Sequence, residues 1–344
     1  MPSQSLSPLI AGFTGGVVST TLLLPLDVIK VRLQVNESPA SPVGSDQKHG
    51  RKRRLGATRV MQGIVKHEGF RGLWVGWTPA VIGSAVSWGG YFFFYESFKK
   101  QLVEHKNRQT SSGGSSNSAT IQSASDVLSS LDNFALACTA GGVMVLMTNP
   151  IWLIKIRMQL QMKRASELLN IKPYRNIGDA VATIVREEGP LALYKGVGPA
   201  LLLTSHGGVQ FVVYEYLKKH FRFQRINREE TGRATQGITK RLQKSAGYLA
   251  MGAVAKIAAS TVTYPLQTIK ARMQQRSDAL EFTADGEVRA VRRDYRGLFS
   301  TIKRVFRQEG FVGFFKGCIP NAIRVAPGAA ITFVVYEALM DYLD

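Results

Sequence analysis

The sequence predicts an all-α membrane protein with six transmembrane helices, formed by three tandem two-helix repeats with pseudo-threefold symmetry. Three observations predict this fold class. The 344-residue chain contains long segments without charged side chains, one ten-residue motif occurs three times, and the segments between the apolar ones are strongly basic.

Six apolar segments are the predicted membrane-spanning helices, and each is close to the ~20 residues that an α-helix needs to cross a bilayer. Two of them, 245–269 and 317–336, contain one cation each, Lys256 and Arg324. The other four contain no charged side chain and cover residues 1–26, 72–95, 133–154 and 196–214. No signal-peptide cleavage pattern precedes the first segment, so we expect it to remain in the mature protein.

The repeated motif fixes the predicted domain organisation. PLDVIKVRLQ begins at residue 25, PIWLIKIRMQ at 150 and PLQTIKARMQ at 265, and an acid–glycine pair follows each one, at 68, 188 and 309. This spacing gives a two-helix unit of roughly 100 residues. The predicted repeats cover 1–100, 131–222 and 245–344, separated by a polar Ser/Gly-rich linker at 101–130 and a basic linker at 223–244.

The motif prolines predict how the repeats meet. A proline inside a helix removes a hydrogen bond and kinks the helix, so Pro25, Pro150 and Pro265 should bend three helices toward a shared axis. Transporters built from repeats often place their binding site at the repeat interface.

The net charge of +20, from 44 Lys+Arg and 24 Asp+Glu, indicates an anionic partner, either nucleic acid, an anionic membrane surface or a phosphorylated solute. Six apolar spans argue against a soluble nucleic-acid-binding protein. No HExxH, GxSxG or Cys/His cluster is present, so we expect neither an enzyme nor a metal site.

The three motif copies, in register over nearly the whole chain, resemble the mitochondrial carrier family. The resemblance implies a matrix gate, an interhelical ring that closes the matrix side. Here Asp27 can form a full ion pair with Lys155, whereas Lys30 would meet the Gln267 amide and Lys270 the Trp152 ring. The matrix-gate residues are therefore Asp27, Lys30, Trp152, Lys155, Gln267 and Lys270.

The resemblance also implies a second ring on the opposite side, the cytoplasmic gate. Met340 occupies its sixth position, so this ring can form at most two ion pairs. The cytoplasmic-gate residues are Glu96, Lys99, Glu215, Lys218 and Glu337.

Two cations break the threefold register and are the predicted solute-binding residues. Lys256 occupies a position that is glycine in the other repeats. Arg324 corresponds to Gly83 and Leu202 of the other repeats, and these two residues are also predicted to bind the solute. Counting the helical rise places both cations near the bilayer midplane, where ionisable residues mark solute pathways. Alternatively, Lys256 extends to the interface and Arg324 binds a backbone carbonyl.

Three further side chains are candidates for contact with the solute. Trp88 could stack on a planar ring while His206 and Gln210 hydrogen-bond its edge, and Tyr91 lies on the same predicted helix as Trp88. The alternatives are packing or lipid-interface anchoring for the tryptophan and a local hydrogen bond for the histidine.

Four strings, SWGGYFFFY, TSHGGVQF, AKIAASTVTYP and IRVAPGAAITFVVYE, look like the mitochondrial folate/FAD carriers. This resemblance implies a monomeric, multi-pass protein of the mitochondrial inner membrane that moves FAD or folate by alternating access. Its partners would be a small anionic solute and membrane lipid, with no bound cofactor. A NAD or pyrimidine nucleotide carrier of the same family is the alternative. Val75 departs from the family motif, which has a basic residue there.

Overall fold

The computed structural model describes residues 7–37, 56–112, 129–162, 172–220, 251–282, 288–292, 295 and 297–343. Each repeat follows the same order of a long helix, a short helix, a 3₁₀ turn and a second helical segment. Repeat 1 contains α1 (Ser7–Val35), α2 (Ala57–Glu68), η2 (Phe70–Trp74) and α3 (Trp77–Ser112).

The second and third repeats vary this order. Repeat 2 contains α5 (Ser130–Leu160), α7 (Ile177–Glu188), η3 (Pro190–Tyr194), α8 (Val197–Leu202), η4 (Leu203–Ser205) and α9 (His206–His220). Repeat 3 contains a helical stretch at 251–262, then α12 (Tyr264–Gln274), β1 (Asp278–Phe282), β2 (Val288–Arg292), α13 (Leu298–Glu309), η5 (Phe311–Phe315) and α14 (Cys318–Leu343). The predicted all-α class with three two-helix repeats is confirmed.

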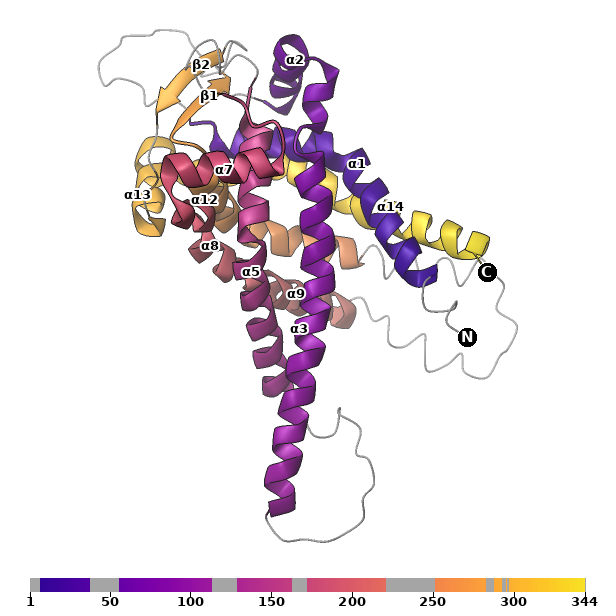
Figure 1. The fold of residues 1–344 in the computed structure, drawn as a ribbon. Coiled ribbons are helices and arrows are strands. Elements are labelled where there is room, and N and C mark those ends of the chain that lie inside the picture. The colour runs from indigo at the N-terminus through magenta and orange to yellow at the C-terminus, as the bar shows by residue number, and fades with distance from the viewer. Residues whose placement is uncertain are drawn as a thin grey trace.

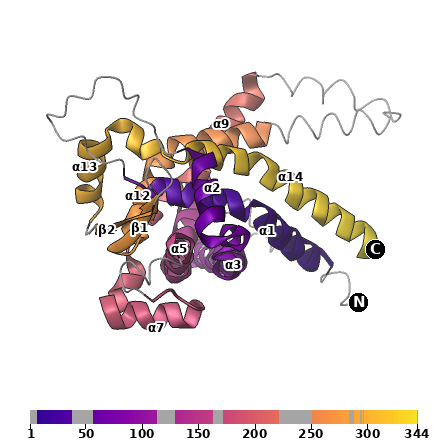
Figure 2. The same cartoon turned by 90° about the horizontal axis from the view of Figure 1, so that it is seen from above.

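The long helices pack in pairs from neighbouring repeats. Helix α1 packs against α14, and α3 packs against α5. Figures 1 and 2 show these two pairs running in different directions away from the region where α1, α5 and α12 meet. The helices therefore converge at one end of the molecule and separate at the other.

Three of the described helices are long and apolar enough to cross a membrane, Ala11–Val35, Ala135–Leu160 and Phe311–Tyr342, and a shorter apolar helix covers Met251–Val262. Interruptions explain why two of the other predicted spans, 196–214 and 245–269, are less continuous, whereas most of 72–95 belongs to the unbroken helix α3. In repeat 2 the turn η4 separates α8 from α9, and in repeat 3 Thr263 separates two helical pieces.

A small apolar core in each repeat fixes the short helix against the long one. Ile29 packs with Ile64 in repeat 1, Ile154 with Ile184 in repeat 2, and Ile269 with Val305 in repeat 3. All six side chains are buried. The pattern follows from the sequence because the long-helix isoleucine is the fifth residue of each motif copy.

Two glycines after the 3₁₀ turns allow close contact between repeats. Gly76 and Gly196 have φ of +83° and +77°, values that L side chains rarely adopt. A Cβ atom on Gly76 would lie 2.9 Å from Gln159 Cγ, and one on Gly196 would lie 2.9 Å from Gln274 Cγ. Each glycine therefore lets one repeat pack directly on the glutamine of the next.

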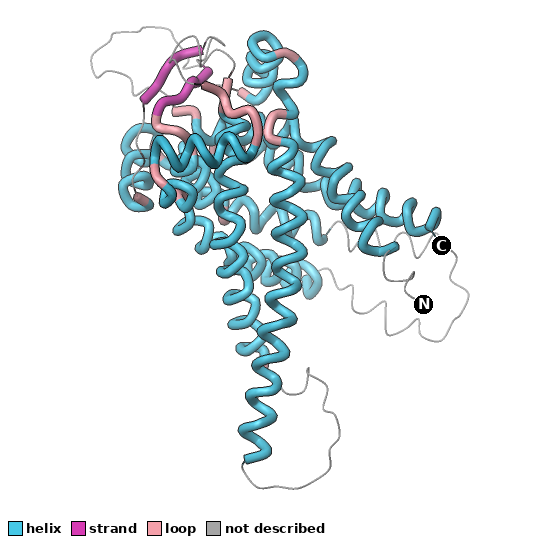
Figure 3. Tube along the Cα trace, viewed as in Figure 1, coloured by secondary structure: helices cyan, strands magenta, loops and turns pink. Residues whose placement is uncertain are grey.

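Two sequence predictions about the connecting segments require correction. Helix α3 continues to Ser112, so residues 101–112 of the predicted linker are helical. Strands β1 and β2 form an unpredicted antiparallel pair, with Asp278 opposite Arg292 (Figure 3). The strand sequences DALEF and VRAVR do not alternate strictly between apolar and polar residues, so they lack the periodic signal of a strand. The remainder of the first linker, at 113–128, and the basic linker at 223–244 lie outside the described residues.

The prolines also behave differently from one another. Pro25 and Pro150 lie within α1 and α5, each of which runs as one continuous helix, whereas Pro265 is the second residue of α12. Because proline is well tolerated in the first turn of a helix, Pro265 starts a new helix after Thr263. The third repeat is therefore interrupted just before its proline, where the sequence analysis expected a kink.

An arginine–glutamate pair joins the long and short helices of each repeat. Arg157 binds Glu188 through two hydrogen bonds of 2.5 and 2.9 Å, and Lys195 Nζ lies 2.7 Å from the same carboxylate. Burial alone would raise the pKa of Glu188, but its bonds to Arg157 and Lys195 lower the pKa to about 2. The corresponding pairs are Arg32 with Glu68 and Arg272 with Glu309.

Replacing Glu188 should therefore destabilise the protein in a pH-dependent way. Glu188→Gln should lower the free energy of unfolding by about 2 kcal/mol near neutral pH, since bonds to charged groups contribute on that scale. The folded-state pKa lies below the usual 4.5, so the contribution is present above pH 4.5 and disappears as the pH falls toward 2. Thermal unfolding of the purified protein at several pH values measures this.

Glu187→Gln is the matched control, because Glu187 is 41% exposed and pairs with Arg276 at the surface, where ion pairs contribute little. Equal destabilisation by both substitutions, or a Glu188→Gln deficit that does not shrink at acid pH, would contradict the prediction.

Candidate functional site

The ends of α1, α5 and α12 bring the predicted matrix-gate residues together. Lys155 Nζ on α5 lies 2.6 Å from Asp27 Oδ2 on α1, and the two side chains are 13% and 8% exposed. Both follow a motif proline at fixed spacing, so the repeat itself places them face to face. The structure therefore contains the ion pair expected between these two residues.

An amide takes the place of an acid at the second contact. Lys30 Nζ donates a hydrogen bond of 3.0 Å to Gln267 Oε1, and the Gln267 amide nitrogen lies 3.4 Å from Ser260 Oγ. The Lys30 ammonium also lies 5.8 Å from the centre of the Tyr264 ring. The positive charge of Lys30 is therefore solvated by neutral groups at this contact.

The contact at the Trp152 ring differs from the predicted one, which was with Lys270. Lys155, not Lys270, is the cation over the Trp152 ring, at 5.1 Å from the ring centre. The indole N–H donates to Ser87 Oγ on α3 at 3.3 Å, which turns the ring toward α3. Within the described part of the chain, no ion pair or hydrogen bond of the Lys270 side chain is found.

Arg324 also lies closer to this ring than the helical-rise count predicts. Its Nη1 is 3.7 Å from Asp27 Oδ1, whereas the count predicts a position near the midplane. The count treats helices as upright rods, but α14 is inclined and the arginine side chain is long (Figure 1). The buried Nε of Arg324 has no hydrogen-bond partner among the described residues, so one donor remains available.

Lys256, the second predicted solute-binding cation, lies close enough to Arg324 for the two charges to interact. Lys256 is exposed, and it also lies near enough to the His206 ring for its charge to act on that ring. The His206 ring nitrogen Nδ1 lies 3.0 Å from Thr263 Oγ1, which satisfies it locally. Gln210 is half-buried on α9.

The remaining predicted solute-binding residues, Gly83, Leu202 and Trp88, differ in how far the structure exposes or describes them. Gly83 is buried against the Trp152 ring, which lies 3.5 Å from where a Cβ would be. Leu202 is 51% exposed at the end of α8. Trp88 lies in α3, but its side chain is outside what the structure describes.

The cytoplasmic-gate residues do not form a ring. Lys218 lies 3.5 Å from Glu215, but both belong to α9. Among the described residues, no ion pair connects Glu96, Lys99 or Glu337 to another helix. The two predicted gates therefore differ: among the described residues, interhelical ion pairs and hydrogen bonds are found at the matrix gate and not at the cytoplasmic gate.

The sequence analysis missed a second layer of contacts beneath the matrix gate. The Nε of each motif arginine donates to the backbone carbonyl of a glutamine in another repeat: Arg32 to Gln159 at 3.0 Å, Arg157 to Gln274 at 3.1 Å, and Arg272 to Gln34 at 2.9 Å. The Gln159 side chain also donates to Asp27 at 3.1 Å. The signal was present, because these residues are the eighth and tenth of each motif copy.

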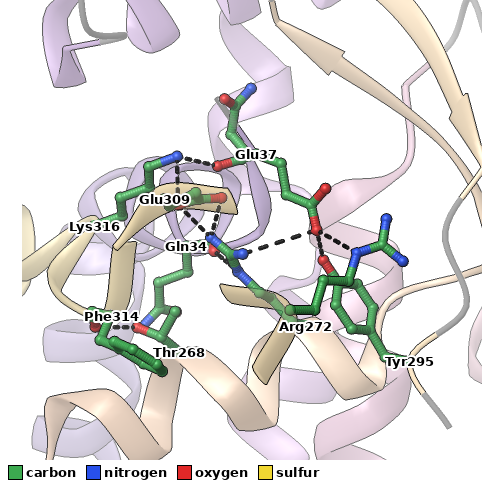
Figure 4. Close-up of polar contacts among 10 residues, drawn as sticks. Gln34, Glu37, Thr268, Arg272, Tyr295, Glu309, Phe314 and Lys316 are labelled. Atoms are coloured by element: carbon green, nitrogen blue, oxygen red, sulfur yellow. Dashed lines mark hydrogen bonds and ion pairs between the residues drawn. The ribbon is translucent and has the colours of Figure 1, made fainter. Parts of the chain in front are cut away.

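Figure 4 shows where the third repeat returns to the first. Arg272 binds Glu309 at 2.9 Å and Lys316 lies 2.8 Å from the same carboxylate. Glu37, just after α1, accepts from the Tyr295 hydroxyl and lies 3.9 Å from Arg272. The circle of three repeats is therefore closed by acids from both the first and the third repeat.

Restoring an acid at position 267 should strengthen the matrix gate. Gln267→Glu would convert the 3.0 Å contact with Lys30 into an ion pair without changing side-chain size. We expect a higher thermal unfolding temperature and slower solute movement, because opening this gate would then require breaking a second ion pair. Unfolding curves and transport rates of reconstituted protein measure the two effects.

Gln267→Ala is the comparison variant, since it removes the contact and should shift both readouts in the opposite direction. A Gln267→Glu protein that unfolds and transports like the parent would show that residue 267 does not limit opening.

Comparison with known proteins agrees with this geometry. A family model described as mitochondrial carrier protein matches residues 2–106, 126–225 and 242–344. Folate transporter 1, chloroplastic, of Arabidopsis thaliana is 37% identical over 333 residues, covering 97% of this chain and 94% of the relative. Nicotinamide adenine dinucleotide transporter 2, mitochondrial, of the same plant is 32% identical and covers 96% and 78%.

A third relative, mitochondrial nicotinamide adenine dinucleotide transporter 1 of Saccharomyces cerevisiae, is 32% identical and covers 99% of this chain and 77% of the relative. The family model and these relatives confirm the resemblance drawn from the repeated motif. The chain belongs to the mitochondrial carrier family and is a solute carrier.

Proposed function

We propose that this protein carries FAD or folate across the mitochondrial inner membrane by alternating access. The choice of an anionic solute rests on one observation: four cations and one acid lie close together where the repeats meet. The charges of Lys30, Lys155 and Arg324 act on the Asp27 carboxylate, and the charge of Lys270 acts on Lys30. A surplus of positive charge in a desolvated site favours binding of a negatively charged ligand.

The choice among anions follows from the chemistry of the cations. Arg324 retains a donor at its buried Nε that no described residue accepts from, and a guanidinium can bind phosphate or carboxylate in a bidentate manner. Lys256 adds a compact charge nearby. FAD contributes two phosphates and folate two carboxylates, so both solutes fit two cations.

The asymmetry of the two gates supports alternating access. The matrix gate is held by the Asp27–Lys155 ion pair, while the described cytoplasmic-gate residues form no interhelical pair. In our proposal the solute enters from the open side and competes with Asp27 for Arg324. It can shift the equilibrium only through its different affinity for the two states.

A NAD or pyrimidine nucleotide carrier is the second candidate. Two relatives named as nicotinamide adenine dinucleotide transporters are each 32% identical to this chain, and NAD also has two phosphates and planar rings. The relative named as a folate transporter is 37% identical. The preference for FAD rests on the local strings in helices that resemble folate/FAD carriers.

The choice of membrane belongs to the same proposal. The names of the relatives include chloroplastic, mitochondrial and peroxisomal carriers. Imaging of the tagged chain against markers for these organelles tests the mitochondrial assignment.

Uptake into liposomes decides between the solutes. We expect reconstituted protein to accumulate labelled FAD or folate faster than labelled NAD. Lys256→Ala and Arg324→Ala should each lower solute affinity by about tenfold or more, since a charge-assisted hydrogen bond contributes ~1.5–3 kcal/mol. Faster uptake of NAD would replace the first candidate by the second.

The controls are Lys219→Ala on α9 and Arg307→Ala on α13, which remove exposed cations away from the proposed site. Undiminished uptake by both Lys256→Ala and Arg324→Ala would refute the assigned binding residues while leaving the solute class intact.

A further inference from the structure

A cavity of about 560 Å³ lies among the helices of the first, second and third repeats, and Arg324 of α14 is not part of its wall. The wall comes from α3, α5, the α8–η4 junction and α12. This volume is in the range of pockets that bind small molecules, ~300–1,000 Å³. The cavity is therefore large enough for a fused heteroaromatic ring.

The wall combines two aromatic rings with few polar groups. Tyr91 and Trp152 line the cavity from α3 and α5, and Met144 adds a polarizable apolar surface. Thr148 and Thr204 also belong to the lining, together with the cation Lys270. Apolar and aromatic walls with a few polar groups are typical of sites for small planar ligands.

Both aromatic rings are held in position. The Trp152 N–H lies 3.3 Å from Ser87 Oγ, and Tyr91 stacks on Tyr95 with 6.1 Å between ring centres. Each ring is nonetheless only half-buried. Lys155 already lies over the Trp152 ring, so a ligand ring would have to share or displace that contact. Rings that are held in position suit stacking, because little side-chain freedom is lost when a ligand binds.

The absence of a side chain at Gly141 keeps the cavity open. Gly141 lines it, and a Cβ there would lie 3.6 Å from Thr204 Cγ2, an ordinary contact distance. Gly141 stands nine residues before its motif proline, the position that Lys256 occupies in the third repeat. At this position of the repeat, repeat 2 has a glycine, which leaves space, and repeat 3 has a lysine, which adds a positive charge.

We propose that this cavity binds the planar heteroaromatic ring of the solute, stacked against Trp152 and Tyr91, while the anionic part of the same solute binds Arg324 and Lys256. The proposal rests on the proposed function for the class of solute. It gives Trp152 a role in selecting the solute beyond its place in the matrix gate. It also explains why an indole stands where an acid would have paired with Lys270.

Ring-only and phosphate-only probes test the two halves separately. Direct binding to the purified full-length protein would be measured by calorimetry with riboflavin, pterin and adenosine, which lack phosphate, and with pyrophosphate, which lacks a ring. We expect at least one ring-only probe to bind the parent protein. Absence of binding by all three would overturn the proposal.

Gly141→Leu fills the cavity, and Gly142→Leu is the matched control on the neighbouring position of α5, outside the lining. Gly141→Leu should weaken binding of the ring-only probe by about tenfold, the scale of losing one stacking platform, and leave pyrophosphate binding unchanged. Gly142→Leu should change neither. Equal ring binding by the two variants would refute the cavity as the ring site.

Two further variants keep the result interpretable. Thr204→Leu fills the cavity from η4 if Gly141→Leu does not fold, and should weaken ring binding in the same way. Trp152→Ala should weaken ring binding, and Trp152→Phe should restore most of it. A protein that passes these tests but takes up none of FAD, folate and NAD would retain the ring site and lose the proposed function.

Discussion

The arrangement of the three repeats depends on three arginines, each of which binds two repeats at once. Arg32, Arg157 and Arg272 each bind the glutamate of their own short helix and donate to the carbonyl of a glutamine in another repeat. All three arginine side chains are at most 2% exposed. A buried cation that loses a partner is costly, so these contacts specify both the fold within a repeat and the order between repeats.

Above this layer, the charge balance depends on two substitutions within the motif. Trp152 and Gln267 stand where the resemblance implies acids, and the surrounding lysines remain. The Gln267 amide accepts from Lys30, whereas Lys155 lies over the indole. Asp27 is therefore the one acid among the six matrix-gate residues, three of which are lysines.

The sequence predicted the repeated architecture and the Asp27–Lys155 contact, because three motif copies share one register and matched positions meet around an axis. It could not place Arg324, since counting residues along a helix neglects inclination and the reach of a long side chain. The pairing of Trp152 with Lys155 was also beyond the motif, because Ser87 on another helix orients the indole. The β1–β2 pair lacked a periodic signal, and the glutamines were overlooked although the motif contained them.

The interruption at Thr263 makes the third repeat mechanically different from the other two. Helices α1 and α5 pass through their prolines as single pieces. The third long segment is divided between 251–262 and α12, with Lys256 on one piece and Lys270 on the other. Because the two lysines lie on different helical pieces, a change of angle at Thr263 would displace Lys256 without disturbing the contacts of Arg272 on α12.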